Sequence, residues 1–267
     1  MRLTVLASGS RGNCTVLSSP GASILVDAGL SCRETLKRMK IAGEDPRQIQ
    51  AIVISHEHAD HVAGVQVLSR KLKVPVYITE KTYQGWRLVT RDPEGRPAEI
   101  ERREFFQAGR SFCVADISIT PFTIPHDAAD PCGFTFEAAG VKAGIVTDLG
   151  YLPRNVKDRL RRCDGLMIES NHDVEMLRTG SYPWAVKQRV MSRVGHLSNA
   201  ALAEFLQSEY DGSAALVILA HLSEQNNHPE IARETARKAM GMRLPLFRSG
   251  ELALATQDRP LPSFHLG

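Results

Sequence analysis

Several features that would assign a chain to a special class are scarce here. The five cysteines among 267 residues are scattered and include no Cys-x-x-Cys pair, which predicts reduced thiols and a cytoplasmic protein. No apolar run approaches the roughly 18 residues that span a bilayer, and the start is too short for a secretory signal, so no membrane association is expected. Aromatic residues make up only 6% of the chain, which argues against extensive base stacking.

Charge and composition leave most other classes open. The net charge of +3 neither indicates nor excludes a nucleic-acid partner, and the sequence predicts no oligomeric state. A hydrophobic content of 43% is ample for a sizeable core. The chain shows no internal repeat and no linker, so a single domain over residues 1–267 is expected.

The apolar pattern alternates between short strands and helices. Strands are expected over residues 3–7, 14–18, 23–27, 51–54, 74–78, 111–114, 117–124, 133–137, 141–147, 166–169 and 216–220, with a last pair near 244–255. Helices are expected over residues 31–40, 62–70, 153–162, 183–194, 199–210 and 229–239. Residues 82–103 are charged with little periodicity, and 91–97 is a predicted exposed loop. This order fits the α/β class, with two sheets packed face to face and helices outside, an αββα sandwich.

The most informative segment is residues 55–61, Ser-His-Glu-His-Ala-Asp-His. It follows the apolar run 51–54, so it occupies the loop after a buried strand. Imidazoles and a carboxylate at one point suit Zn²⁺ or a similar divalent ion. A polar loop that is rich in histidine by chance is the alternative, but three of the nine histidines of the chain fall in this one segment.

Three later polar residues repeat this arrangement. His126, Asp148 and His221 each come just after an apolar, β-branched run. If the strands of one core bring their following loops to a shared edge, all these side chains meet there.

This set resembles the His-x-His-x-Asp-His signature and later ligands of the metallo-β-lactamase superfamily of metal-dependent hydrolases. The resemblance implies the αββα fold and two divalent ions, Zn²⁺ or Mn²⁺. It implies that His56, His58 and His126 hold the first ion, that Asp60, His61 and His221 hold the second, and that Asp148 bridges them. A hydroxide shared by the two ions would be the nucleophile, and Asp60 would belong to the catalytic groups. His58 favours hydrolysis over redox chemistry, because flavodiiron relatives have a glutamate at that position.

The resemblance also suggests residues around the ions. Asp27 would orient the metal loop through hydrogen bonds, although a simple turn cap is the alternative. Asp127 could orient a ligand in the same way. His196, in Gly195-His196-Leu197-Ser198, resembles the histidine that protonates the leaving oxygen in tRNA 3′-processing and β-CASP nucleases, so it is the candidate general acid. An ordinary position near a helix start, with Ser198 as cap, is the alternative. Glu169 could pair with His196 and hold its proton.

Substrate-binding residues have weaker support. The turn Ser8-Gly9-Ser10-Arg11-Gly12-Asn13 offers hydroxyls and backbone N–H groups that could cradle a phosphate, with Ser10 and Asn13 as candidates, although hairpins use the same residues. His228 could reach the substrate or could cap the helix that begins at Pro229.

The combined motifs are similar to the bacterial YycJ (WalJ) subfamily, which is associated with 5′-to-3′ exonuclease activity on DNA. The resemblance therefore implies a dinuclear-metal phosphodiesterase with a nucleic-acid substrate, DNA being favoured. Two basic segments could track a phosphate backbone or could be solvated helix faces: Arg154, Lys157, Arg159, Arg161 and Arg162; and Arg178, Lys187, Arg189 and Arg193. A small-molecule metallo-hydrolase, acting on a cyclic phosphate or an acyl group, is the alternative activity. A degenerate scaffold is disfavoured because no ligand is missing.

Overall fold

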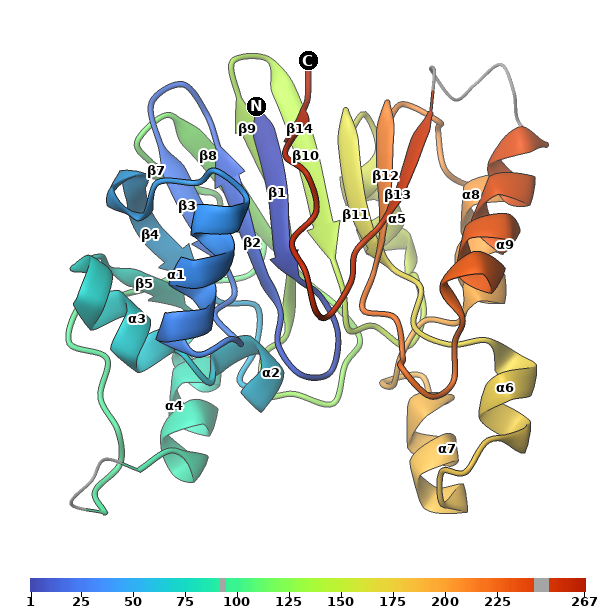
Figure 1. The fold of residues 1–267 in the computed structure, drawn as a ribbon, viewed down its shortest axis with the longest axis horizontal. Helices are drawn as coiled ribbons and strands as arrows, with labels where there is room; N and C mark the ends of the chain where they lie inside the picture. The colour runs from blue at the N-terminus through green and yellow to red at the C-terminus, as the bar shows by residue number, and fades with distance from the viewer. Residues whose placement is uncertain (92–94, 243–249) are drawn as a thin grey trace.

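Two seven-stranded sheets form the centre of the molecule in the computed structural model, which describes residues 1–91, 95–242 and 250–267 (Figure 1). The first sheet has the order β14-β1-β2-β3-β4-β5-β6 and the second β13-β12-β11-β10-β9-β8-β7. The strands of the first sheet are β1 (Arg2–Ala7), β2 (Cys14–Ser18), β3 (Ser23–Val26), β4 (Ile49–Val53), β5 (Val76–Ile78), β6 (Arg103–Phe105) and β14 (Phe264–His265). Those of the second are β7 (Phe112–Val114), β8 (Ile117–Thr123), β9 (Cys132–Ala138), β10 (Val141–Val146), β11 (Gly165–Glu169), β12 (Leu216–Ala220) and β13 (Glu251–Leu254).

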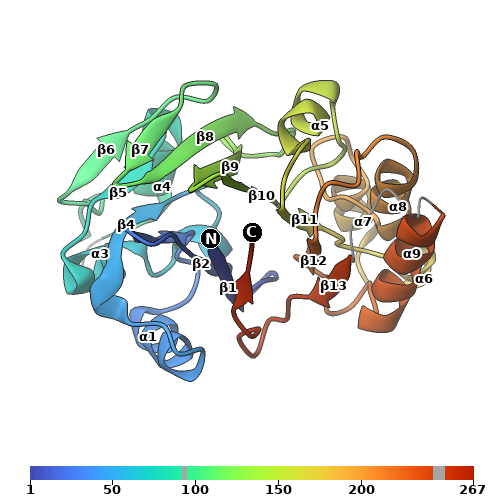
Figure 2. The same cartoon turned by 90° about the horizontal axis from the view of Figure 1, so that it is seen from above.

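Helices cover the outer faces of both sheets (Figure 2). On the side of the first sheet are α1 (Cys32–Ile41), α3 (Val65–Leu72) and α4 (Glu80–Val89). On the side of the second are α5 (Arg154–Leu160), α8 (Asn199–Ser208) and α9 (Pro229–Gly241). The short helices α2 (Ala59–Val62), α6 (Val174–Thr179) and α7 (Trp184–Val190) lie at the lower edge in Figure 1, and a 3₁₀ turn spans Pro46–Gln48. The predicted αββα sandwich is confirmed.

The core has three apolar layers. Alternate residues of the same strand enter different layers: Ile24 and Val26 face the second sheet, whereas Leu25 between them packs toward the helices. Strands that are buried on both faces have continuous apolar runs rather than alternating ones, which is why these runs were recognisable as strands. Among the described residues, no helix is both long and apolar enough to cross a bilayer.

Most predicted elements are present, and the differences concern helices and short elements. Residues 80–89 form α4 where no helix was expected, because Tyr83 and Trp86 make a short buried stripe and Thr79 caps the helix by accepting from the N–H of Thr82. The predicted helix 62–70 is instead two helices, α2 and α3. They meet near Gly64, where a Cβ would lie 1.9 Å from the carbonyl oxygen of Leu30.

The other differences concern ends and short elements. The predicted helix 183–194 ends at Val190, because the chain turns there and Val190 accepts a hydrogen bond from the N–H of His196. The elements α6, β6 and β14 were not predicted; each has six residues or fewer, too short for a periodic signal. Of the strand pair expected near 244–255, β13 is present and the part over 243–249 lies outside the described residues, as do positions 92–94 of the expected loop.

Candidate metal centre

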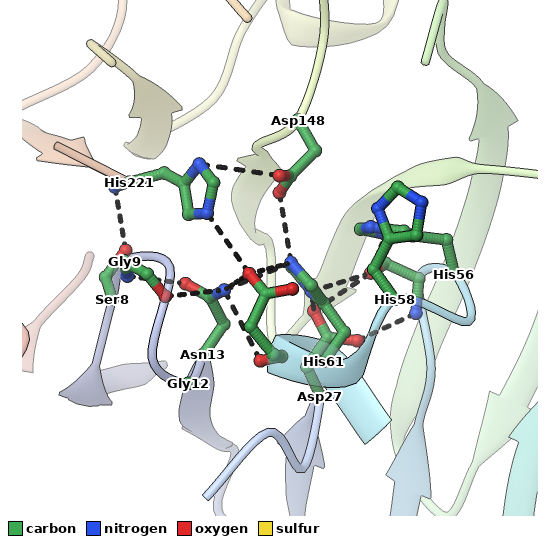
Figure 3. A network of polar contacts seen from close by, with 12 residues as sticks. Ser8, Gly9, Gly12, Asn13, Asp27, His56, His58, His61, Asp148 and His221 are labelled. Carbon is green, nitrogen blue, oxygen red and sulfur yellow. Dashed lines mark hydrogen bonds and ion pairs between the residues drawn. The ribbon is translucent and has the colours of Figure 1, made fainter. Parts of the chain in front are cut away.

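Parallel strand pairs bring the predicted ligands to one edge of the molecule. In the first sheet β3 and β4 run parallel, and in the second β10, β11 and β12 do so. Their carboxyl ends are followed by Asp27, the loop 55–61, Asp148 and His221, and Glu169 is the last residue of β11. Figure 3 shows His56, His58, His61, Asp148 and His221 converging at this edge.

Three of these residues have a backbone conformation that is uncommon outside glycine. Asp27 and Asp148 each have a φ of 62°, and His221 has a φ of 54°. Each lies one or two residues beyond the end of its strand, so the left-handed turn aims the side chain across the sheet edge rather than along the strand. Uncommon conformations that cluster in this way are typical of functional sites.

The first group of potential ligands contains His56, His58 and His126. Their donor atoms lie within 4.8 Å of one another, and Nε2 of His126 is 3.2 Å from Nδ1 of His58. Burial lowers the pKa of His56 well below its ordinary value and also lowers the pKa of His126, so both imidazoles are neutral and offer a lone pair. Nε2 of His56 is buried and has no hydrogen-bond partner among the described residues. A cation is the partner that this atom fits.

The second group contains Asp60, His61, Asp148 and His221, again with donor atoms within 4.8 Å. Nε2 of His61 is 3.2 Å from Oδ2 of Asp148, and Nε2 of His221 is 3.4 Å from Oδ2 of Asp60. Burial raises the pKa of Asp60 and Asp148, but the neighbouring imidazoles outweigh it and hold the pKa of both carboxyls below the ordinary range. Two buried carboxylates among nitrogen donors supply the negative charge that a divalent ion would balance.

The carboxylate of Asp148 lies near residues of both groups. Its Oδ1 is 3.4 Å from Nδ1 of His221, and its charge also acts on His56 and His126 of the first group. Its Oδ2 is buried, and its contact with His61 lacks hydrogen-bond geometry. This oxygen, like Nε2 of His56, is suited to a metal ion.

Asp27 contacts two residues of the loop 55–61. Its two oxygens accept from the N–H of Ser55 at 2.8 Å and the hydroxyl of Ser55 at 3.0 Å, and Oδ2 is 2.8 Å from Nδ1 of His61. A proton on Nδ1 leaves Nε2 of His61 free to coordinate, so Asp27 fixes both the ring and its tautomer. For His126, the corresponding partner is the carbonyl of Gly195, 3.2 Å from Nδ1.

The predicted general acid and its partner are in direct contact. Nδ1 of His196 lies 2.8 Å from Oε1 of Glu169, and Oε2 of Glu169 accepts from the N–H groups of Leu149 and Leu197. Burial raises the pKa of Glu169, but the imidazoles of His196 and His221 lower it to about 2. Burial lowers the pKa of His196, but the Glu169 carboxylate outweighs it and raises the pKa. His196 retains 18% side-chain exposure, so its imidazole is accessible from solvent.

The Gly-rich turn supports the metal loop rather than cradling a phosphate with its backbone. The N–H groups of Gly9, Arg11, Gly12 and Asn13 all donate to acceptors within the protein. The Asn13 amide donates to Oδ2 of Asp60 at 3.0 Å and accepts from Gly9, so Asn13 orients a candidate ligand. Ser10 is exposed.

Two further predicted residues have contacts of a different kind. Oδ1 of Asp127 is 3.5 Å from Nε2 of His126, the nitrogen that would coordinate, so Asp127 does not orient this ring through the opposite nitrogen; Arg189 pairs with its other oxygen. His228 is exposed and accepts from the N–H of Glu230, so it caps α9, as the alternative interpretation held.

Sequence reasoning did not identify two of the supporting residues. The hydroxyl of Ser8 accepts from the N–H of His221 at 2.8 Å, and the amide of Asn171 donates to the carbonyl of His221 at 2.8 Å. These bonds hold the left-handed turn at His221. Ser8 begins the Gly-rich turn noted above and Asn171 lies two residues after Glu169, but only the fold shows that each contacts the backbone of His221.

The basic segments have partners within the protein. Arg189 pairs with Asp127, and Arg193 lies over the ring of Tyr151 with 4.2 Å between the guanidinium carbon and the ring centre. On α5, Asp158 lies within 4.0 Å of Arg154 and Arg161. These contacts favour a structural role for the residues named.

Two buried histidine and carboxylate groups at one edge of an αββα sandwich define a metal-dependent hydrolase of the metallo-β-lactamase fold. Residues 22–222 match the family model described as the β-lactamase superfamily domain, and the chain therefore belongs to this superfamily.

Curated relatives and a solved structure agree with this assignment. The chain is 36% identical to the exodeoxyribonuclease YycJ of Bacillus anthracis over 90% of its own length and 89% of that protein. It is also 36% identical to the exodeoxyribonuclease WalJ of Streptococcus pneumoniae, over 88% and 86% of the two chains. The fold is similar to that of Zn²⁺-bound PqqB from Methylobacterium extorquens, with a TM-score of 0.72, 17% identity and coverage of 98% and 99%.

Proposed function

We propose that this protein is a dinuclear-metal phosphodiesterase that degrades DNA from the 5′ end. The relatives YycJ and WalJ are named exodeoxyribonucleases and match almost the whole chain, which supports a nuclease and favours DNA. Three groups of residues in the described part of the chain could hold an ion, and the two that contain the predicted ligands support two divalent ions; the third, Asp148, Glu169, His196 and His221, includes the predicted general acid. One observation carries the proposal: the His196–Glu169 pair lies directly beside these donors, with Nδ1 of His196 3.8 Å from Oδ1 of Asp148.

His56, His58 and His126 would hold one ion and Asp60, His61 and His221 the other, with Asp148 contributing to both. When bound, the ions supply hydroxide at neutral pH and neutralise charge on the phosphate. His196 donates the proton on Nε2 to the departing oxygen, while Glu169, paired with Nδ1, favours the protonated imidazole before that step. Asp27 and Asn13 hold the metal loop in place, so the donors are arranged before the substrate arrives.

Finer assignments complete the proposal. Zn²⁺ and Mn²⁺ both suit a site of imidazoles and carboxylates. All five cysteines are free, which supports a reducing compartment and hence the cytoplasm. Leu3 and Leu266, near the two ends of the chain, enter the same layer between the sheets, which supports one domain over the whole chain.

The test uses purified protein with Mn²⁺ or Zn²⁺ and single- or double-stranded DNA or RNA labelled at the 5′ or 3′ end. We expect mononucleotides to be released from the 5′ end of DNA. His196→Ala should retain its metals and lose about 10²–10⁴-fold in turnover, because a positioned general acid contributes that much. Asp148→Ala is the inactive control. Intact polymers under both metals, with hydrolysis of a small cyclic phosphate or acyl ester, would instead establish the small-molecule alternative.

A further inference from the structure

A cavity of about 250 Å³ lies beside the second donor group. Three segments border it: the Gly-rich turn at Ser8, the segment that follows His221, and residues 254–258. Leu222, the residue after His221, lies in its wall, and the Ser8 hydroxyl in the lining accepts from the N–H of His221 (Figure 3). The cavity therefore begins one hydrogen bond away from a candidate ligand.

Position distinguishes this cavity from larger ones. Two cavities of about 580 and 600 Å³ contain no candidate ligand and no residue adjacent in sequence to one. The first lies beside β6 and the start of β7, and the second lies around β14. The smaller cavity, in contrast, is lined by Leu222, the residue after the candidate ligand His221.

The lining suits a flat ring that is bound through its faces, without hydrogen bonds from the protein to its edges. Leu222, Pro229, Leu254 and Ala255 supply apolar surface. The Gln257 amide is used internally, since it accepts from the N–H of Arg11 and donates to the carbonyl of Gly12. The Asn227 amide is likewise occupied.

Asn227 donates to the carbonyls of Ser170 and Asn171 and accepts from the N–H of His228. Amides engaged in this way present little to the hydrogen-bonding edge of a ligand. Apolar contact with the face of a ring does not discriminate between nucleobases, because every nucleobase has such a face.

The mouth of the cavity is crossed by exposed ion pairs. Arg11 pairs with Glu224 and with Asp258, the latter at 2.9 Å, and its side chain is 60% exposed. Glu224 and Asp258 both line the cavity. Exposed ion pairs of this kind are weak, so a ligand that enters the cavity could displace them at little cost in free energy.

We propose that this cavity, the base pocket (Ser8, Leu222, Asn227, Pro229, Leu254 and Ala255), receives the nucleobase of the terminal nucleotide while its phosphate lies at the metal donors. The inference rests on the proposed function and adds to it a binding site for one unpaired base. A pocket with room for a single base fits removal of nucleotides from an end. Its occupied amides give similar binding of all four bases.

The test compares nucleotides with their abasic counterpart. Calorimetric titration of the metal-loaded protein would measure the dissociation constants of the four 2′-deoxynucleoside 5′-monophosphates and of 2-deoxyribose 5-phosphate. The base should tighten binding about tenfold or more, because burial of its apolar face against aliphatic side chains is favourable. The four nucleotides should agree within about threefold, because no edge is read.

Variants that fill the pocket locate this effect. Thr256 and Pro229 both line the cavity, so a tryptophan at either position should fill it. In Thr256→Trp and in Pro229→Trp, 2-deoxyribose 5-phosphate and the nucleotides should therefore bind with similar dissociation constants, a ratio of about one. Ile231→Trp, an exposed position on the same helix as Pro229, is the matched control and should keep the full ratio. The two variants lie on different segments, so if one fails to fold the other still tests the pocket.

The outcomes separate the pocket from the proposed function. A ratio near one in the unmodified protein, or an unchanged ratio in both tryptophan variants, overturns the base pocket. If labelled DNA is degraded while the ratio is one, only the pocket is wrong. If DNA resists degradation while the base effect is present and lost in the variants, the nuclease assignment is wrong and the pocket binds free nucleotides.

Discussion

Glu169 is fully buried, yet its carboxylate has partners on every side. Two backbone N–H groups and the imidazoles of His196 and His221 surround its two oxygens. A buried carboxylate stays ionised only with such compensation, which is why its pKa is about 2. This charge in turn raises the pKa of His196, so the chemistry of one residue is set by the environment of another.

Glu169→Gln should lower turnover and move the alkaline limb of the pH–rate profile to lower pH. In the proposed mechanism His196 donates a proton, so the rate should fall as the pH rises through its pKa. Glu169 raises that pKa, and removing the charge lowers it. Profiles of turnover against pH check this, with the exposed Glu137→Gln as a matched control. An unshifted alkaline limb would show that His196 is not the titrating acid.

Asn13→Ala should weaken metal binding about 10–100-fold, as the loss of outer contacts to a ligand does. Its amide holds Oδ2 of Asp60 at 3.0 Å, and without it that carboxylate is free to rotate. Competition with a chromogenic chelator measures the affinity, and the neighbouring Ser10→Ala is the control. Equal metal affinities in the two variants would contradict the role of Asn13 in orienting Asp60.

At the scale of elements, the sequence predicted best where runs were long and apolar. The runs before His126, Asp148 and His221 identified β8, β10 and β12 and therefore the edge at which the ligands meet. What could not be predicted depends on contacts between distant segments. The division at Gly64 follows from its approach to Leu30, and the use of Asn13 follows from its approach to Asp60.

Helix α4 shows how a short stripe escapes recognition. Its surface is charged or exposed, and only Tyr83, Trp86 and the capping Thr79 indicate a helix. We expect Trp86→Ala to reduce the free energy of unfolding by about 3–5 kcal/mol, because a large fully packed side chain leaves a cavity.

Leu88→Ala on the same helix should change the free energy of unfolding by less than about 0.5 kcal/mol, since Leu88 is 74% exposed. Urea titration of both variants measures the difference. Similar stabilities of the two would mean that α4 is not docked on the first sheet as described.

At the scale of the whole molecule, the two sheets have separate tasks at one edge. The first sheet supplies the loop 55–61 and Asp27, and the second supplies His126, Asp148 and His221. The layer between the sheets, with residues such as Leu3 and Leu266, fixes their relative position. The donor cluster therefore exists only when both sheets are packed together, and metal binding should be coupled to folding.

The metal content of the purified protein tests the central claim most directly. After loading with Zn²⁺ or Mn²⁺ and removal of free metal, mass spectrometry of the metal should find about two ions per chain and fewer in Asp148→Ala, because that carboxylate serves both groups. Activity on DNA should disappear with chelation and return with metal. An unmodified protein that retains no metal, or one that degrades DNA fully after chelation, would contradict the account.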